Sequence, residues 1–295
     1  MKKTILFVIF FLSIHSGVFG SGFPSLKIGT DAQLTAMGFA GTALAENGAS
    51  SFWNPATLPF IQGKKLIFSY HRWIQDVQSQ FIGFGTGFSN IGFGAYLLYT
   101  EVGDMGYRIA IPTPDPLGTF SDHEMVAGIS FAYQAIRSLS IGLSMKLYYQ
   151  KLFTDESTGL GGDVGVLYEV WKEGLRIGGV VQNIGKTGKL REESIELPLL
   201  VKFGAAVPVS IGDGRLLCAV DGEQEKDFPF YLHGGLEYGW QDLLYVRLGY
   251  QTGNETRWIT GGMGVRWRHY RLDYSYMPLR SSLGDSHRLS FGFEW

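Results

Sequence analysis

Hydrophobic and polar residues alternate along most of the chain. Between Leu139 and Gln150 every odd-numbered residue is apolar, and every even-numbered residue except Tyr148 is small or polar. A period of two predicts a β-strand with one apolar face. At about 3.3 Å per residue this strand is roughly 40 Å long, whereas strands in soluble proteins usually have about five or six residues. It is therefore long enough to cross a bilayer at a tilt.

The same alternation recurs and predicts fourteen strands, an even number as in bacterial single-chain barrels. We expect them near residues 65–74, 77–88, 90–102, 123–136, 139–153, 158–171, 173–184, 197–210, 214–225, 229–240, 243–253, 256–268, 270–279 and 286–295. Links such as Gln75-Asp76, Arg137-Ser138, Gln241-Asp242 and Asn254-Glu255 are short, whereas Gly103–Asp122 and Lys186–Glu196 are long. Short turns at one rim and long loops at the other are typical of outer-membrane barrels.

A soluble sandwich or propeller would show the same alternation, with its apolar face inward. Strand length favours lipid outside, and so does the small and polar character of the opposite face. Aromatic residues also end several apolar faces, as in an interfacial girdle: Trp73, Tyr149, Tyr250, Trp267, Tyr276 and Trp295. We therefore predict an all-β fold, an antiparallel transmembrane barrel of about 14 strands, located in the outer membrane and in contact with its lipid.

The chain begins with a segment that resembles an export signal. Lys2 and Lys3 precede an apolar run at Ile5–Leu12, and small residues lead to a cleavage position after Gly20. The run is too short to span a bilayer as a helix, although an uncleaved anchor remains the alternative. We predict that residues 1–20 are a cleaved signal peptide.

Residues 21–62 lack the strand pattern. Gly29–Phe60 is rich in small residues, and Asn54-Pro55 reads as a helix N-cap with proline in the first turn. The segment is either a lead-in arm or a plug. Because about fourteen strands enclose a lumen too wide for their own side chains to fill, we expect a luminal hatch at 21–62 and the barrel at 63–295.

Composition agrees with a β-protein that does not bind nucleic acid. The chain has 41 glycines and 15% aromatic residues, a mixture that weakens helices and favours strands. Its formal net charge of −2 gives no basis for nucleic-acid binding. The single Cys218 cannot form an intrachain disulfide.

The last strands carry charges on their predicted polar face. They are Glu237, Arg247, Arg266, Arg268, Arg271, Asp273, Arg288 and Glu294. Neighbouring strands lie about 4.8 Å apart, so the charges can form an internal ladder of salt bridges that contacts the hatch. The other interpretation is a site for an anionic head group or a carboxylate, which arginine binds well.

Catalytic motifs are weak. In Asp285-Ser286-His287, adjacent residues of a strand point to opposite faces and cannot form a triad by themselves. Gly179–Thr187 nearly spells a phosphate loop, but its first glycine comes one residue too early. No clustered cysteines and histidines suggest zinc. We expect no enzyme, no metal site and no cofactor.

Two segments carry a family resemblance. Ala36–Ala45 (AMGFAGTALA) and Ala49–Ala56 (ASSFWNPA) resemble the opening of the PorV/PorQ family, within the superfamily of FadL-type fatty-acid transporters. Val181–Gly185, Leu197–Pro198 with Lys202–Ala206, Gly235–Tyr238 with Val246–Tyr250, and Arg271–Tyr276 with Gly284–Ser290 are further matches. The resemblance implies a fourteen-stranded barrel whose hatch contains Trp53, Asn54 and Pro55.

The resemblance also implies two functions. PorV-like and PorQ-like members assist type IX secretion or surface attachment, with secretion-system proteins or exported clients as partners, whereas FadL-like members move hydrophobic molecules. This chain is short for the secretion members. Its end, HRLSFGFEW, reads as the closing strand, paired with Leu66–Trp73, with Leu289, Phe291, Phe293 and Trp295 facing lipid. A terminal aromatic also resembles the signal that barrel-assembly machinery recognises.

Overall fold

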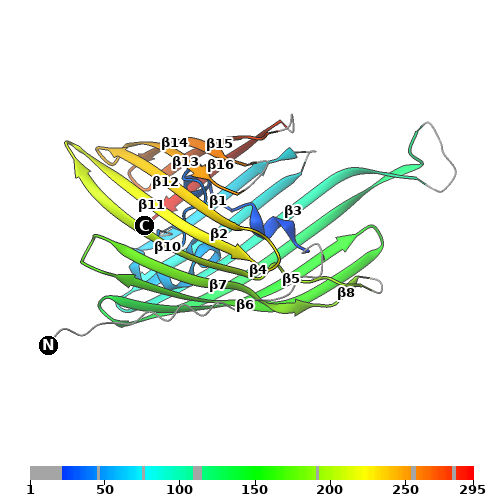
Figure 1. The fold of residues 1–295 in the computed structure, drawn as a ribbon, viewed down its shortest axis with the longest axis horizontal. Helices are drawn as coiled ribbons and strands as arrows, with labels where there is room; N and C mark the ends of the chain where they lie inside the picture. Colours follow the sequence, from blue (N-terminus) through cyan, green and yellow to red (C-terminus); the bar gives the residue numbers. More distant parts are fainter. Residues whose placement is uncertain are drawn as a thin grey trace.

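A computed structural model describes residues 22–44, 47–74, 77–108, 115–190, 193–253, 257–280 and 284–295. Fourteen antiparallel strands form a closed barrel (Figure 1). They are β1 (Lys64–Arg72), β2 (Gln78–Phe88), β3 (Ile91–Tyr107), β4 (Gly118–Ile136), β5 (Leu139–Leu152), β6 (Asp155–Glu169), β7 (Arg176–Thr187), β10 (Leu200–Ile211), β11 (Gly214–Glu225), β12 (Phe230–Trp240), β13 (Leu244–Gln251), β14 (Ile259–Trp267), β15 (Tyr270–Pro278) and β16 (Asp285–Glu294). The predicted fold class is confirmed.

The first and last strands close the wall. Phe68 pairs with Phe291 and Tyr70 with Leu289 along the antiparallel β1–β16 seam. The closing strand therefore leaves no open edge, as predicted, and backbone groups in a bilayer must be paired in this way.

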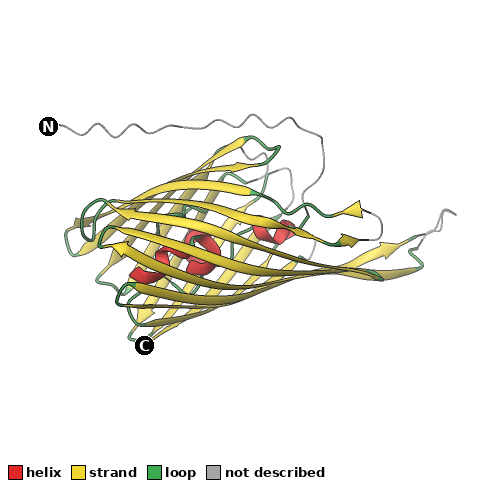
Figure 2. Cartoon of the chain, turned by 90° about the horizontal axis from the view of Figure 1, so that it is seen from below, coloured by secondary structure: helices red, strands yellow, loops and turns green. Residues whose placement is uncertain are grey.

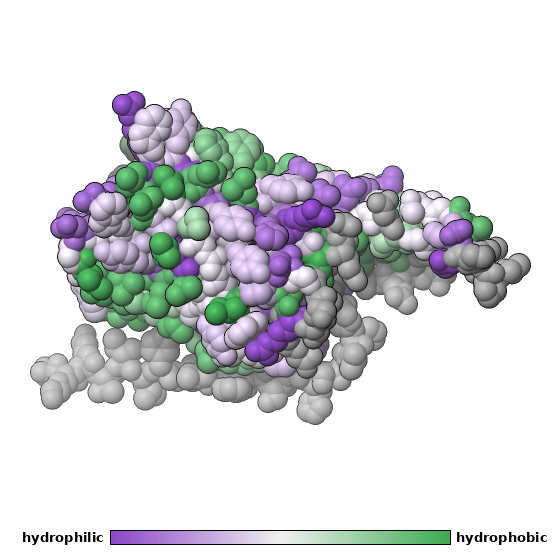
Figure 3. Space-filling model, turned by 90° about the horizontal axis from the view of Figure 1, so that it is seen from above, coloured by the Kyte–Doolittle hydropathy of each residue, from purple (hydrophilic) through white to green (hydrophobic). Residues whose placement is uncertain are grey.

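Alternation sorts the side chains onto two faces. Leu143 is 56% exposed on the outer face, whereas Ser144 is 9% exposed on the inner face. Figure 3 shows hydrophobic residues gathered on the outer wall. Trp73 is the exception to the predicted girdle, because β1 ends at Arg72 and the Trp73 ring stacks on the inward-facing His71.

The loop predicted at Gly103–Asp122 is shorter in the structure, so its predicted bounds were wrong. Strand β3 continues to Tyr107 and β4 already begins at Gly118, so the two strands form a ribbon that projects beyond the barrel (Figures 1 and 2). A bulge between Val102 and Met105 shifts the register and interrupts the alternation there. A two-stranded sheet of β8 (Lys189–Leu190) and β9 (Glu193–Ser194) interrupts the other long link. The links at 75–76 and 254–255 lie outside the described residues.

The N-terminal segment folds inside the barrel (Figure 2). It contains η1 (Pro24–Lys27), α1 (Ala32–Ala36), α2 (Ser50–Trp53) and η2 (Pro55–Phe60). Asn54 caps η2 as expected, because its side-chain oxygen accepts the Ala56 amide at 3.0 Å, although η2 is a 3₁₀ helix. None of the helices in the described ranges is long and apolar enough to span a membrane. The predicted signal peptide lies outside the described residues.

Inward-facing glycines let this hatch touch the wall. A Cβ atom at Gly142 would overlap the Pro55–Ala56 backbone, and one at Gly249 would overlap the Gly38 amide. Close approach of two backbones requires glycine. Part of the high glycine content therefore comes from wall positions on which the hatch rests.

Candidate functional site

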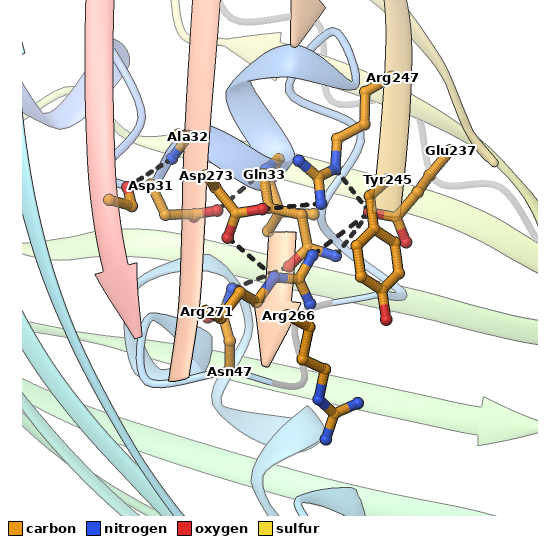
Figure 4. Close-up of polar contacts among 12 residues, drawn as sticks. Asp31, Ala32, Gln33, Asn47, Glu237, Tyr245, Arg247, Arg266, Arg271 and Asp273 are labelled. Carbon is orange, nitrogen blue, oxygen red and sulfur yellow. Dashed lines mark hydrogen bonds and ion pairs between the residues drawn. The ribbon is translucent and has the colours of Figure 1, made fainter. Parts of the chain in front are cut away.

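Arg247 is the centre of an ion-pair network inside the barrel (Figure 4). Its Nε lies 2.6 Å from Glu237 Oε2 and its Nη2 lies 2.8 Å from Asp273 Oδ1. Arg271 pairs with the same two carboxylates, at 3.5 Å and 2.8 Å. Two cations thus balance two carboxylates across β12, β13 and β15. Because the Arg247 side chain is fully buried, its charge depends on these partners.

The same network holds the hatch. Gln33 donates its side-chain amide to Glu237 at 3.2 Å, and Asn47 donates to Gln33 at 3.4 Å. Arg288 stands apart from these residues and donates from Nη2 to the main-chain oxygen of Ile28 at 2.9 Å. The predicted contact between the charged ladder and the hatch therefore exists. Binding of an anionic head group to these arginines stays a prediction.

Asp31 stabilises the hatch from within. Its carboxylate caps α1 by accepting the Leu34 amide at 2.9 Å, and it accepts the Trp53 indole N–H at 2.7 Å. Burial raises the pKa of the Asp31 carboxyl above its ordinary value, and the neighbouring Arg288 charge opposes that shift. Asp31 connects two helices that are far apart in sequence.

Two predicted residues lie at the short-turn rim. Arg266 pairs with Glu294 at 2.7 Å and lines a polar cavity of ≈ 200 Å³ together with Arg271. Arg268 was wrongly predicted to face the lumen. It lies in the turn after β14 with φ 54°, and its guanidinium covers the outward-facing Trp267 ring at 5.1 Å. The turn residue breaks the alternation on which the prediction rested.

Sequence reasoning missed a second buried network, on β5, β6 and β7. Lys146 Nζ lies 2.7 Å from Asp163 Oδ2 and 2.9 Å from Asn183 Oδ1. Asn183 has φ 62° at a bulge in β7, and its main-chain N–H donates to Asp163 Oδ1 at 2.8 Å. The neighbouring Gln182 donates to the main-chain oxygen of Phe52 at 2.6 Å. The Val181–Gly185 motif was visible in the sequence and contains Gln182 and Asn183. The residues that these two side chains contact lie on other segments and could not be read from the motif.

The hatch motif Trp53, Asn54 and Pro55 helps attach the hatch to the barrel wall. Asn54 donates its side-chain amide to the Thr42 carbonyl at 2.8 Å and to the Val166 carbonyl at 3.3 Å. One amide thus joins two hatch segments to β6. This geometry is structural rather than catalytic.

The Asp285-Ser286-His287 segment separates as predicted. Ser286 faces inward and its hydroxyl lies 2.7 Å from His71 Nε2, whereas exposed His287 lies 2.7 Å from the Tyr274 hydroxyl. The two side chains cannot act on one substrate. Among the described residues, no group of three histidine, cysteine or carboxylate side chains is placed to hold a metal ion.

An apolar cluster lines the lumen toward the long-loop rim. Wall residues contribute Ile67, Phe81, Tyr96, Leu98, Val126, Tyr148 and Met277. Phe23, Leu26 and Phe52 are among the residues of the N-terminal segment that pack into it. The Phe23 ring meets Tyr148 edge-on at 5.4 Å, and the Phe52 ring meets Tyr96 edge-on at 5.8 Å. The interior of a membrane barrel is ordinarily polar. At these positions the inner face of the wall is apolar, although polar side chains such as Ser79 and Glu124 lie on the same face.

Comparisons with known proteins identify the fold. No family model matches the chain, and no curated protein matches it. The toluene transporter TbuX from Ralstonia pickettii matches with a TM-score of 0.65 at 15% identity, over 90% of this chain and 98% of TbuX. The toluene transporter TodX from P. putida matches with 0.64 at 14%, over 90% and 99%. A Pseudomonas aeruginosa FadL homologue matches with 0.56 at 10%, over 90% and 98%.

The fold is that of the FadL-type barrels. These matches agree in fold with the wider resemblance seen in the sequence. They do not single out PorV or PorQ, and that narrower resemblance stays a prediction.

Proposed function

We propose that this protein is an outer-membrane channel for small hydrophobic molecules. The observation that carries the proposal is the apolar lining formed by inward-facing wall residues such as Phe81, Leu98 and Val126. An apolar molecule loses contact with water in such a lining, which favours its entry. Matches to two toluene transporters with the same fold support the same function.

The N-terminal segment fills the space that a cargo molecule would need. Polar contacts hold it near the long-loop rim, among them Gly22 N to Glu196 O at 2.9 Å, Ser25 N to Glu124 Oε2 at 3.3 Å, Lys27 Nζ to Glu225 Oε1 at 2.7 Å and Arg257 Nη1 to Lys27 O at 3.1 Å. The remaining hatch is held by the two buried networks and by Asn54. Displacement of Phe23–Leu26 alone would uncover the Tyr148 side of the cluster, whereas the Phe52 ring of the remaining hatch would stay against Phe81 and Tyr96.

A role in protein secretion is the weaker candidate. The resemblance to PorV and PorQ suggested it, but the matched structures are those of hydrophobic-compound channels. No contact or surface described above favours it over transport.

Uptake of radiolabelled toluene by cells that carry the protein in their outer membrane tests the proposal. We expect faster uptake than in cells without it. Linking Ser25→Cys to Glu124→Cys with a short bismaleimide, in a Cys218→Ser background, should lower uptake, whereas either single cysteine should not. Equal uptake with and without the protein, together with co-purification of exported proteins, would favour the secretion role.

A further inference from the structure

Two apolar grooves mark the outer wall, and they differ in one respect. The first, of ≈ 550 Å³, crosses β10–β14 and is lined by side chains such as Val220, Leu236 and Leu248. The second, of ≈ 480 Å³, crosses the β16–β1–β2–β3 seam and contains the amide side chain of Gln80. Apart from Cys218 and Tyr250, the first groove is lined by hydrocarbon groups. The second contains a side-chain amide, whose hydrogen bonds hydrocarbon chains cannot satisfy.

Side chains of the second groove lie in rows set by strand register. The lower row is Phe291, Phe68, Ile82 and Leu97, and the next is Leu289, Tyr70, Gln80 and Tyr99. Above them, at the end of β1, lie His287, Arg72, Gln78 and Glu101. Alternation points all three rows outward. The groove thus changes from apolar to polar toward the long-loop rim, which faces the cell exterior in barrels of this kind.

Gln80 carries the argument. Its side chain is exposed on the outer wall, and it makes no hydrogen bond within the described ranges. An amide without partners is costly in hydrocarbon, where no water replaces the missing bonds. The Tyr70 hydroxyl above the groove donates to Gln78 at 3.0 Å, and Tyr99 contacts His123 at 2.8 Å, so the polar end is already ordered.

We propose that this groove binds a glycolipid of the outer leaflet. An acyl chain lies along Phe68, Ile82 and Leu97, and a hydroxyl or amide near the chain's attachment point bonds Gln80. The sugar head meets Arg72, Gln78 and His287. Glu101 lies in the same row, and Asp285 lies one row nearer the rim on β16, so this end offers the donors of Arg72 and the acceptors of the carboxylates to a hydrogen-bonding sugar.

Native mass spectrometry of the purified full barrel, with lipid A as the probe, tests the inference. We expect one retained lipid A per barrel and weaker retention of phosphatidylethanolamine. Gln80→Leu removes the amide, and Gln80→Trp fills the groove. Each should lower lipid A retention about fivefold, the effect of one lost hydrogen bond. Thr158→Leu and Thr158→Trp, at an exposed outward position near the same rim on β6, are the matched controls and should change nothing.

The proposal would be overturned by equal retention of both lipids, by retention that neither Gln80 variant changes, or by equal losses in the Thr158 variants. A loss with Gln80→Trp alone would also overturn it, because the groove would then hold a chain without recognising a head group. Toluene uptake is not part of this test, so the glycolipid site and the channel function stand or fall separately.

Discussion

Gln182 on β7 donates its side-chain amide to the main-chain oxygen of Phe52 at 2.6 Å, and this bond ties the barrel wall to the hatch. Gln182 also reaches the Trp53 carbonyl at 3.2 Å. Both carbonyls lie at the end of α2, where a helix leaves its last oxygens without intrahelical partners. The wall thus supplies what the short hatch helix lacks.

Removing that amide should loosen the hatch. Gln182→Leu leaves two buried carbonyls without their donor, and we expect a loss of about 1–3 kcal/mol in the free energy of unfolding. Urea titration followed by tryptophan fluorescence measures it. Gln78→Leu removes an exposed amide on the outer face and should change stability little. Equal losses in the two variants would contradict the role assigned to Gln182.

Arg247 should matter more than Arg266. Arg247→Met leaves Glu237 and Asp273 buried with Arg271 as their shared partner, and we expect a loss of about 3–5 kcal/mol, as for other broken buried pairs. Arg266→Met removes a partly exposed pair and should cost about 1 kcal/mol or less. The same unfolding titration compares them. A larger effect at Arg266 would show that the buried network is not the stronger one.

The outward direction of β5 can be tested with a charge. Leu143→Arg places a cation on the lipid face near the middle of the strand, at a cost of about 2–4 kcal/mol. Ile211→Arg lies at the rim end of β10 and should cost about 0–1 kcal/mol. Heat-modifiable migration on gels reports the assembled fraction. Normal assembly of Leu143→Arg would place that side chain away from the bilayer centre.

Gly142 should not tolerate a methyl group. Its Cβ would overlap the Pro55–Ala56 backbone, so Gly142→Ala must push the hatch from the wall and should lower the melting temperature. Gly179→Ala is the control, because its Cβ would make only ordinary contacts, the nearest at 3.6 Å. Equal melting temperatures would mean that the hatch does not rest on β5.

Asp31 predicts a pH dependence. Burial raises the pKa of the Asp31 carboxyl, so the folded state disfavours its ionised form. The free energy of unfolding, measured relative to Asp31→Asn, should therefore fall as pH rises through the raised pKa. Below about pH 4 the carboxyl is largely neutral even when unfolded, and the difference between the two proteins should level off. Unfolding titrations between acid and neutral pH measure this difference. A difference that ran in the opposite direction would show that Asp31 is stabilised as a carboxylate.

Sequence alone predicted the wall because each strand repeats one simple pattern. Leu139–Gln150 shows its lipid face directly, and the pairing of the last strand with the first followed from the need to leave no edge, whereas the register that sets Phe68 against Phe291 came from the structure. The pattern failed where the backbone departs from regular alternation: at the bulge after Val102, at the turn that holds Arg268, and at Trp73 beyond the end of β1.

The site was harder to predict than the wall. The positions of the charged residues were visible in the sequence. Their partners were not, because they depend on the register between strands that are far apart in sequence, as the contact between Lys146 and Asn183 shows. The apolar luminal cluster was hidden as well. Val126 and Leu98 are buried on the inner face, and the apolar character of the lumen there becomes visible only when they are seen in one cluster with hatch residues such as Phe23 and Phe52.

The apolar luminal cluster is the central claim, and a bound heavy atom tests it most directly. Crystals of the barrel soaked with 4-bromotoluene should give an anomalous bromine peak among Phe81, Val126 and Tyr148, with Phe23 displaced. Bromine peaks confined to the lipid-facing wall, with Phe23 still against Tyr148, would contradict the account.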